Sequence, residues 1–441
     1  MKLKYLARLF TFALILWSCA PSSVANAPTG SSLPAAPSIT PAGPSGLATT
    51  PHAIFGPTRQ WYLLPDPLFH EDVHVAVTFP DIDPSVGTPR ARLRGNGRVV
   101  ALTRTPGLPA SWQAEMPLDG VRAGPQTIEI VVRLHDGTDA SLAARDFILS
   151  APEYVVWTLD FEGDAAGDPE MANAAAIADS LKVPMTLMWN PRVWTTTQVT
   201  PERAQVMQQW MTSMVGQGLG EVALHLHMWT DFVRAAGLVP RTAPSWAGRS
   251  DGYDVPLTAF SETETKTLLD YSLKLMAEHG LPRPTSFRAG GEFANASNLR
   301  ALAAAGFTAD CSAVPAGAFG RLPYPWTLSM DAQPYHPSAD DANAAGSLSL
   351  LEAPTIGGNT YAYDVNTIRP MVRADLSFLA PVGEAASAAR AITIVSHPGT
   401  IVATERAAIE SLFAAFAPLR YDRDIGPVRF VTLAQLARAY G

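Results

Sequence analysis

The chain has 441 residues, and its 32 basic and 40 acidic side chains give a formal net charge of −8 at pH 7. This length is sufficient for two folded domains, and the mildly acidic charge without clustered Lys and Arg argues against a nucleic-acid-binding surface. The two cysteines are Cys19 and Cys311. Because the first lies in the leader described next, we expect no intramolecular disulfide.

The first 19 residues predict an export signal. Three basic residues precede an apolar run at 9–17, which is too short to span a bilayer. The run closes with Leu16-Trp17-Ser18-Cys19, which resembles the bacterial lipobox, where cleavage before the cysteine leaves it lipidated as the new N-terminus. Because Trp17 is bulky for its place in that pattern, simple secretion stays open. We expect an exported protein that is lipid-anchored to a bacterial membrane, on its periplasmic or outer-surface side.

Two segments precede the main domain. Residues 20–56 are rich in Pro, Ala, Ser, Thr and Gly and carry almost no charge, which is typical of a tether that cannot bury enough apolar surface to fold. Residues 57–150 consist of short alternating runs, such as 73–79 and 127–134, separated by turn signals. This pattern predicts a small all-β sandwich of the immunoglobulin-like kind, which serves as a spacer or binds glycan.

Residues 152–441 alternate between strand and helix patterns. Apolar and β-branched runs predict strands at 154–159, 183–189, 221–229, 286–289, 307–310, 391–395 and 428–431, and helical patterns lie at 169–181, 201–216, 261–279, 298–306 and 405–416. Ser261 and Glu264 have the spacing of a capping box. Such alternation predicts parallel strands in an α/β barrel or an open sheet, with catalytic residues at the C-terminal ends of the strands.

Polar residues stand at the ends of successive strands of this domain: Asp160, Glu162, His225, His227, Arg288 and His397. Side chains alternate along a strand, so His225 and His227 point to the same face and can share a divalent metal. Each residue alone would be explained as a cap, an ion pair or a turn former. Together, at successive strand ends, they predict an active site.

These residues stand in short motifs that resemble those of one family. The motifs are Thr158-Leu159-Asp160-Phe161-Glu162, Glu221-Val222-Ala223-Leu224-His225, Ser286-Phe287-Arg288-Ala289-Gly290, Ile394-Val395-Ser396-His397 and Phe430-Val431-Thr432-Leu433. In order and context they resemble the motifs of the NodB-type polysaccharide deacetylases, carbohydrate esterase family 4. A divergent branch with F-R-A-G and H-x-H-x-W segments is closer still. The resemblance covers roughly residues 152–441 and implies a distorted (β/α) barrel of the polysaccharide deacetylase type, preceded by the small sandwich.

Two positions depart from the family pattern. Phe161 stands where the family has its metal-binding aspartate, and the next acid is Glu162. Trp229 stands where the family has its second histidine, and His227 comes two residues earlier. Each pair, Asp160 with Glu162 and His225 with His227, keeps one strand face, so the metal site is either rebuilt or lost.

The resemblance implies a role for each residue. Glu162, His225 and His227 would bind a divalent metal, most simply zinc, with cobalt or nickel as alternatives. Asp160 would be the general base, held ionised by Arg288, and His397 the general acid, although the roles of Asp160 and Glu162 could be exchanged. Expected contacts to substrate are Trp229, Glu292, Tyr335 and His336. The tryptophans Trp189, Trp194, Trp229 and Trp326 are either core residues or sugar-stacking platforms, and His279 is interpreted as a cation at a helix C-terminus.

The sequence therefore predicts a metal-dependent hydrolase that removes N- or O-linked acetyl groups from a polysaccharide or a cell-envelope glycan. The ion would polarise the acetyl carbonyl and acidify a water. One alternative is a glycan-binding protein on the same fold whose metal site has been lost. A second alternative, a glycosidase using Asp160 and Glu162, is disfavoured because residues two apart on a strand rarely flank a bond at the required separation of about 5–9 Å.

Overall fold

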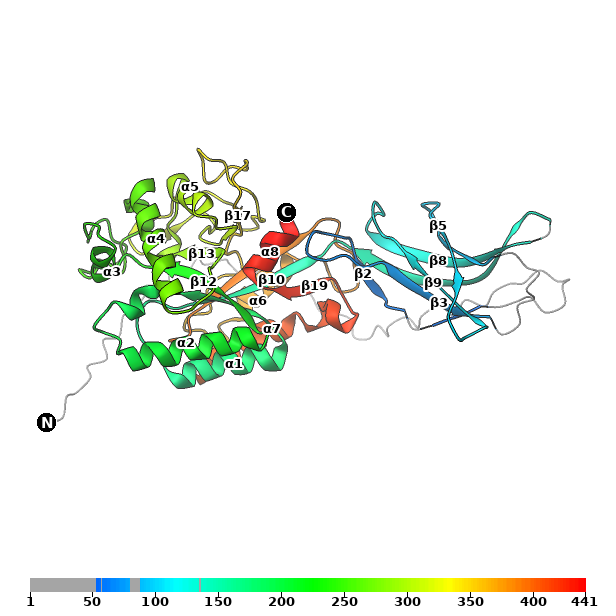
Figure 1. Cartoon of the computed structure of the whole chain (residues 1–441), viewed down its shortest axis with the longest axis horizontal. Coiled ribbons are helices and arrows are strands. Elements are labelled where there is room, and N and C mark those ends of the chain that lie inside the picture. The colour runs from blue at the N-terminus through cyan, green and yellow to red at the C-terminus, as the bar shows by residue number, and fades with distance from the viewer. Residues whose placement is uncertain (1–52, 57, 80–87, 135) are drawn as a thin grey trace, which may run out of the picture. The chain divides into compact units, whose positions relative to one another are not determined.

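The computed structural model describes residues 53–56, 58–79, 88–134 and 136–441 (Figure 1). The export signal predicted at 1–19 lies outside the described residues, as does the predicted tether up to residue 52. Ile54–Phe55, which the prediction placed in the tether, form strand β1 and pair with β3.

The N-terminal part of the described chain is all β and consists of two sheets. The first contains, in spatial order, β1 (Ile54–Phe55), β3 (Val73–Thr78), β7 (Ser111–Met116) and β6 (Thr103–Arg104). The second contains β2 (Trp61–Leu63), β9 (Asp139–Ser150), β8 (Gly124–Arg133), β4 (Arg90–Leu93) and β5 (Val99–Ala101). In β3 the valines at 73, 75 and 77 are buried whereas His74 is exposed, which is the alternation expected of a sheet with one face in a core. The all-β character predicted for this segment is confirmed.

The C-terminal part is built on one curled sheet of eight parallel strands. Its order is β17 (Leu351–Glu352), β14 (Ala309–Asp310), β13 (Ser286–Ala289), β12 (Gly220–Leu226), β11 (Met185–Trp189), β10 (Glu153–Asp160) and β18 (Arg390–Ser396), and β19 (Val428–Val431) pairs with the N-terminal half of β10. A short hairpin, β15 (Ala318–Phe319) and β16 (Leu322–Pro323), lies outside this sheet. The α/β class and the distorted barrel predicted from the sequence are confirmed.

Helices connect the strands and cover the sheet. They are α1 (Asp168–Leu181), α2 (Pro201–Gly216), α3 (Thr230–Ala235), α4 (Glu262–Glu278), α5 (Ala296–Ala304), α6 (Arg369–Ser377), α7 (Ala403–Ala415) and α8 (Leu433–Tyr440), with 3-10 turns η1 (Pro191–Trp194), η2 (Leu257–Ala259), η3 (Gly290–Glu292), η4 (Ala417–Leu419) and η5 (Tyr421–Arg423). Helix α1 runs beside α7 (Figure 1). Helix α4 begins with the predicted capping box, in which Ser261 and Glu264 bond reciprocally. In the described part of the chain, no helix combines the length and the apolar character needed to cross a bilayer.

The alternation of β10 separates a structural face from a functional face. Val155, Trp157 and Leu159 are fully buried in the main core, together with helix residues such as Ile177 and Met207. The side chains on the other face of β10, which include Thr158 and Asp160, point to the interior of the barrel, as the contacts described below show. Because every strand of the sheet is parallel, residues at the ends of β10, β12, β13 and β18 meet at one end of the barrel.

Candidate active site

All six residues predicted at the strand ends line one small cavity of about 60 Å³. Its remaining lining residues are Trp246, Tyr253, Gly291, Glu292, Phe319, Asn359 and Val395. Side chains as distant in the sequence as Asp160 and His397 therefore share a single site, as the parallel strand order requires.

Glu162 is at the centre of this cavity and contacts three histidines. Its Oε2 lies 2.5 Å from Nε2 of His227 and 3.8 Å from Nε2 of His225, and its Oε1 lies 3.2 Å from Nε2 of His397. Potential ligand atoms of Glu162, His225 and His227 all lie within 4.8 Å of one another. Two imidazole nitrogens and a carboxylate oxygen form a donor set that suits zinc and similar divalent ions.

The two strand histidines are oriented by backbone carbonyls. Nδ1 of His225 is 3.0 Å from the carbonyl oxygen of Arg288, and Nδ1 of His227 is 2.8 Å from that of Tyr253. A carbonyl can only accept a hydrogen bond, so each Nδ1 donates, and each Nε2, which is turned toward Glu162, is the nitrogen left to bind a metal. Nε2 of His225 is buried and has no hydrogen-bond partner within the described residues. This orphaned acceptor fits a bound metal ion, and the residues present are suited to hold one.

Gly290 directly follows β13, the strand that carries Arg288, and lies against His227. A Cβ built at this position would lie 2.6 Å from Nδ1 of His227. A larger residue at this position would push the imidazole of His227 aside. The glycine therefore allows His227 to contact Tyr253 and Glu162.

Asp160, the last residue of β10, is paired with Arg288 of β13. Nη1 of Arg288 donates to Oδ1 and Oδ2 of Asp160 at 3.0 and 3.2 Å, and both side chains are almost fully buried. The remaining donors of the guanidinium bind Thr158, Thr355 and the carbonyl of Cys311. Such a fully satisfied buried pair holds Asp160 as a carboxylate acceptor.

The charges around Glu162 favour its ionised form. Burial raises the pKa of Glu162, but His227, His225 and His397 outweigh burial and hold that pKa well below its usual value. Burial lowers the pKa of His225, but the carboxylates of Asp160 and Glu162 outweigh it and the net shift is upward. The site is thus a cluster of mutually stabilised opposite charges that a cation of charge +2 could enter by displacing protons from the imidazoles.

Tyr253 is a site residue that sequence reasoning missed. Its hydroxyl donates to Oε2 of Glu162 at 3.0 Å, its ring stacks on His227 with centroids 4.0 Å apart, and its carbonyl accepts from the same histidine. It stands in the long connection between α3 and α4. Nothing in the local pattern of that connection marks it, because the contact to Glu162 joins residues 91 positions apart.

Of the four residues expected to contact substrate, Glu292 lines the cavity. Its backbone has a positive φ of 67°, an uncommon conformation for a residue with a side chain, and its carboxylate accepts from the hydroxyl of Tyr324 at 3.1 Å. Burial raises the pKa of Glu292, a shift that Arg288 opposes. Strained backbone of this kind is often found at functional sites.

The other three residues are not among those lining the cavity. Trp229 is buried and donates from Nε1 to the carbonyl of Glu162 at 2.9 Å, so it anchors the backbone of a site residue. The Tyr335 hydroxyl donates to the carbonyl of Ala342, and Nδ1 of His336 is 3.1 Å from the carbonyls of Leu348 and Leu350. Tyr335 and His336 therefore brace their own loop.

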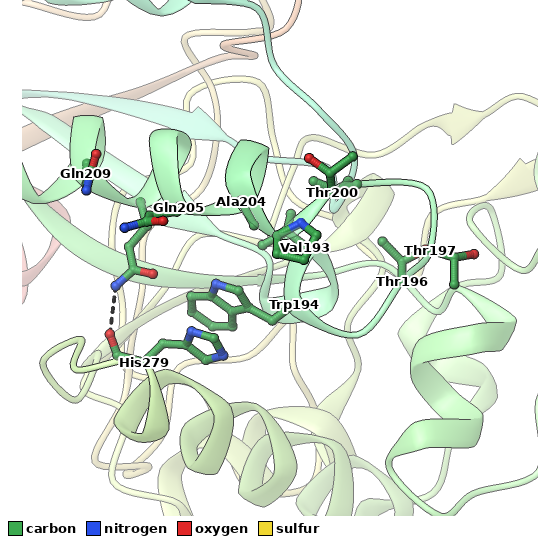
Figure 2. Close-up of a pocket in the computed structure, with 12 residues that line it drawn as sticks. Val193, Trp194, Thr196, Thr197, Thr200, Ala204, Gln205, Gln209 and His279 are labelled. Atoms are coloured by element: carbon green, nitrogen blue, oxygen red, sulfur yellow. Dashed lines mark hydrogen bonds between the residues drawn. The ribbon is translucent and has the colours of Figure 1, made fainter.

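A second and larger cavity, of about 730 Å³, lies along η1 and the first turns of α2 (Figure 2). Its lining residues include threonines, glutamines, Trp194 and His279 but no Asp, Glu, Lys or Arg. The imidazole of His279 stacks on Trp194 with centroids 4.1 Å apart, and burial lowers its pKa. His279 is the C-terminal cap of α4, as expected, whereas its burial opposes the charged form that was expected there. This cavity has no carboxylate and a single imidazole, so it does not offer a set of metal-binding groups.

No protein-family model matches the chain, and no curated protein sequence is similar to it. Similar solved structures include a candidate polysaccharide deacetylase from Mycobacterium smegmatis, with 16% identity and a TM-score of 0.42 over 65% of this chain and 89% of that one. The family 4 carbohydrate esterase from Streptomyces lividans has 14% identity and a TM-score of 0.31 over 60% and 88% of the two chains. For the peptidoglycan deacetylase PdaC from Bacillus subtilis these values are 14%, 0.32, 66% and 92%.

Proposed function

We propose that the protein is a metal-dependent hydrolase that removes acetyl groups from a polysaccharide or a cell-envelope glycan. The observation that carries this proposal is the arrangement of His225 and His227, each donating from Nδ1 to a backbone carbonyl and each turning Nε2 to Glu162. An ordinary buried ion pair does not require two histidines held in this tautomer, whereas a metal site does.

A divalent ion held by Glu162, His225 and His227 would polarise the acetyl carbonyl and acidify a water. Asp160 accepts the proton of the attacking water, and the hydrogen bonds from Arg288 fix that carboxylate in place. His397, which is partly exposed at the cavity, donates a proton to the departing nitrogen or oxygen of the sugar. The acyl C–N or C–O bond breaks, a C–O bond to the water oxygen forms, and the products are acetate and a free amine or hydroxyl group.

The assignment of Glu162 as ligand and Asp160 as base follows from their partners. Glu162 contacts the two strand histidines and makes no ion pair with Arg288. Asp160, in contrast, is bound by Arg288. The same geometry argues against a glycosidase, because potential ligand oxygens of Asp160 and Glu162 lie within 4.8 Å of one another, closer than the carboxylate pair of such an enzyme, at about 5 Å or more.

The test is metal content and acetate release of the purified protein. We expect about one equivalent of zinc, cobalt or nickel per chain, acetate release from an acetylated oligosaccharide, and loss of both on chelation or in the His225→Ala/His227→Ala variant. His74→Ala is the matched control, since this histidine is exposed on a strand of the all-β part. A parent protein that binds no metal even after reconstitution would contradict the mechanism and favour a glycan-binding protein without catalysis.

A further inference from the structure

The proposed general acid, His397, has one ring nitrogen without a partner. Its Nε2 lies 3.2 Å from Oε1 of Glu162, but its Nδ1 is buried and has no hydrogen-bond partner within the described residues. The strand histidines differ, because each of them donates from Nδ1 to a backbone carbonyl. The position of the His397 ring therefore depends chiefly on the backbone that carries it.

That backbone forms a tight turn directly after β18. The N–H of Thr400 donates to the carbonyl oxygen of His397 at 3.0 Å, and the hydroxyl of Thr400 lies 3.0 Å from the same oxygen. This hydroxyl also lies 3.4 Å from Oε1 of Glu405, in the first turn of α7. The turn is therefore tied to a carboxylate of the helix that follows it.

The same carboxylate oxygen binds a second segment beside His397. The hydroxyl of Thr360 donates to Oε1 of Glu405 at 3.1 Å, and the N–H of Thr360 donates to the carbonyl of Val395, in β18, at 3.0 Å. The next residue, Tyr361, has its ring edge-on to the imidazole of His397, with centroids 6.4 Å apart. One oxygen atom thus joins the two segments that flank the imidazole.

The hydrogen bonds that reach Glu405 have a single direction. Nε1 of Trp157 can only donate, and it donates to Oγ of Ser396 at 2.9 Å. The arrangement that satisfies every donor then runs from the Ser396 hydroxyl to Thr360, at 2.8 Å, and from Thr360 to Glu405. All four side chains are buried, so Glu405 is the terminal acceptor of a buried chain that begins next to His397. Without this acceptor a buried hydroxyl would be left unsatisfied, which folded proteins rarely tolerate.

We propose that Glu405 is a positioning residue for the general acid His397. Its carboxylate joins the turn that carries His397 to the neighbouring segment, and so holds the imidazole toward the departing nitrogen or oxygen of the sugar. This inference rests on the proposed function and deepens it. Glu405 does not line the cavity, so it acts through Thr360 and Thr400 and not on the substrate.

The leaving group separates this role from a merely structural one. The amine of an N-acetylated sugar must be protonated as it departs, whereas 4-nitrophenolate leaves without a proton. In the metal-loaded protein, we expect Glu405→Leu to lower kcat for a β-1,4-linked N-acetylglucosamine hexamer roughly ten- to a hundredfold, with turnover of 4-nitrophenyl acetate within about twofold of the parent. Glu405→Gln, whose amide oxygen still accepts from both hydroxyls, should keep most of the activity on the hexamer. Glu410→Leu is the control in the same helix, because this glutamate is partly exposed and pairs with Arg406.

A measurement without turnover keeps the inference separate from the proposed function. The imidazole NMR signals of His397, assigned by their loss in His397→Ala, should move in Glu405→Leu and stay in place in Glu405→Gln. A parent that releases acetate from neither probe would reject the proposed function, and these signals would then decide the role of Glu405 by themselves.

Two results would overturn the inference. In the first, Glu405→Leu loses activity equally on the hexamer and on the aryl ester, which is the pattern of general structural damage. In the second, it keeps the activity and the His397 signals of the parent. Should thermal unfolding show that Glu405→Leu is not folded, Thr360→Val and Thr400→Val take its place. Each removes one of the two contacts, and each should show the same selective loss on the hexamer.

Discussion

At the scale of single residues, the site depends on side chains that hold one another. Glu162 has four neighbours, the three histidines and Tyr253, and each of the strand histidines is braced by a carbonyl. Residues that orient a ligand from outside the coordination sphere commonly affect metal affinity almost as much as the ligands do. Tyr253 is the clearest such residue, because it touches both Glu162 and His227.

Removing only the hydroxyl of Tyr253 tests this role. Tyr253→Phe keeps the ring stacked on His227 and keeps the backbone carbonyl, but it removes the hydrogen bond from the hydroxyl that helps to orient Glu162. We expect zinc affinity to fall about tenfold, measured by competition with a chromogenic chelator. Tyr271→Phe is the control. The ring of Tyr271, in α4, packs against Phe232 of α3 and lies outside the cavity. Equal zinc affinity in the parent and Tyr253→Phe would show that the hydroxyl does not position the carboxylate.

At the scale of elements, the strongly periodic segments were predicted almost residue for residue. Helix α2 begins at Pro201 and ends at Gly216 as expected, because a threonine cap and a proline in the first turn mark its start. Helix α8 was missed, although Thr432 and Gln435 form a capping box. Only a strand at 428–431 and a family motif at 430–433 were expected in this region, and the motif concealed the start of the helix.

Helix α6 makes stability depend on pH in a way that can be measured. Asp375 is buried, neither of its carboxylate oxygens has a hydrogen-bond partner in the described part of the chain, and burial raises its pKa to about 8. The unfolded chain releases this proton near pH 4, but the folded protein keeps it up to about pH 8. The contribution of Asp375 to the free energy of unfolding is therefore complete below about pH 4. As the pH rises to about 8 this contribution is lost, and the free energy of unfolding falls by at most ~5 kcal/mol.

Asp375→Asn removes this titration. We expect the unfolding temperature of the parent to fall more steeply between pH 5 and pH 9 than that of the variant, so that the variant is the more stable protein at pH 9. The measurement is thermal unfolding by circular dichroism at a series of pH values, with Glu384→Gln, an exposed carboxylate, as control. Parallel curves for the parent and Asp375→Asn would contradict the assignment.

At the scale of the whole molecule, we propose that the protein is exported and lipid-anchored through Cys19, with the segment from residue 20 to the start of β1 as its tether. Metabolic labelling with a radioactive or alkyne-tagged fatty acid tests this proposal. The full-length chain should incorporate the label and fractionate with membranes, and Cys19→Ala should abolish both, because a lipid anchor needs the thiol. Cys311→Ala, which changes a buried cysteine of the barrel, is the control. A labelled Cys19→Ala protein would be incompatible with lipidation at this residue.

The sequence by itself determined the features of this protein that follow from residue periodicity and from capping and turn residues. The alternation of strands and helices specified a parallel sheet, and the alternation within strands placed His225 and His227 on one face, where the structure has them with ring centroids 4.9 Å apart. It also supplied every charged member of the proposed catalytic set, because catalytic groups at strand ends stand beside regular elements that leave a clear pattern.

Only the tertiary structure decided which partners those residues have and what surrounds them. Asp160 and Glu162 were equivalent in the sequence, and their partners Arg288 and His227 distinguish them, each more than 60 residues away along the chain. Tyr253 comes from an irregular connection and Phe319 from a strand of two residues, where no period links side chain to position. The physical reason is that contacts within an element repeat with its geometry, whereas contacts between loops depend on the packing of the complete fold.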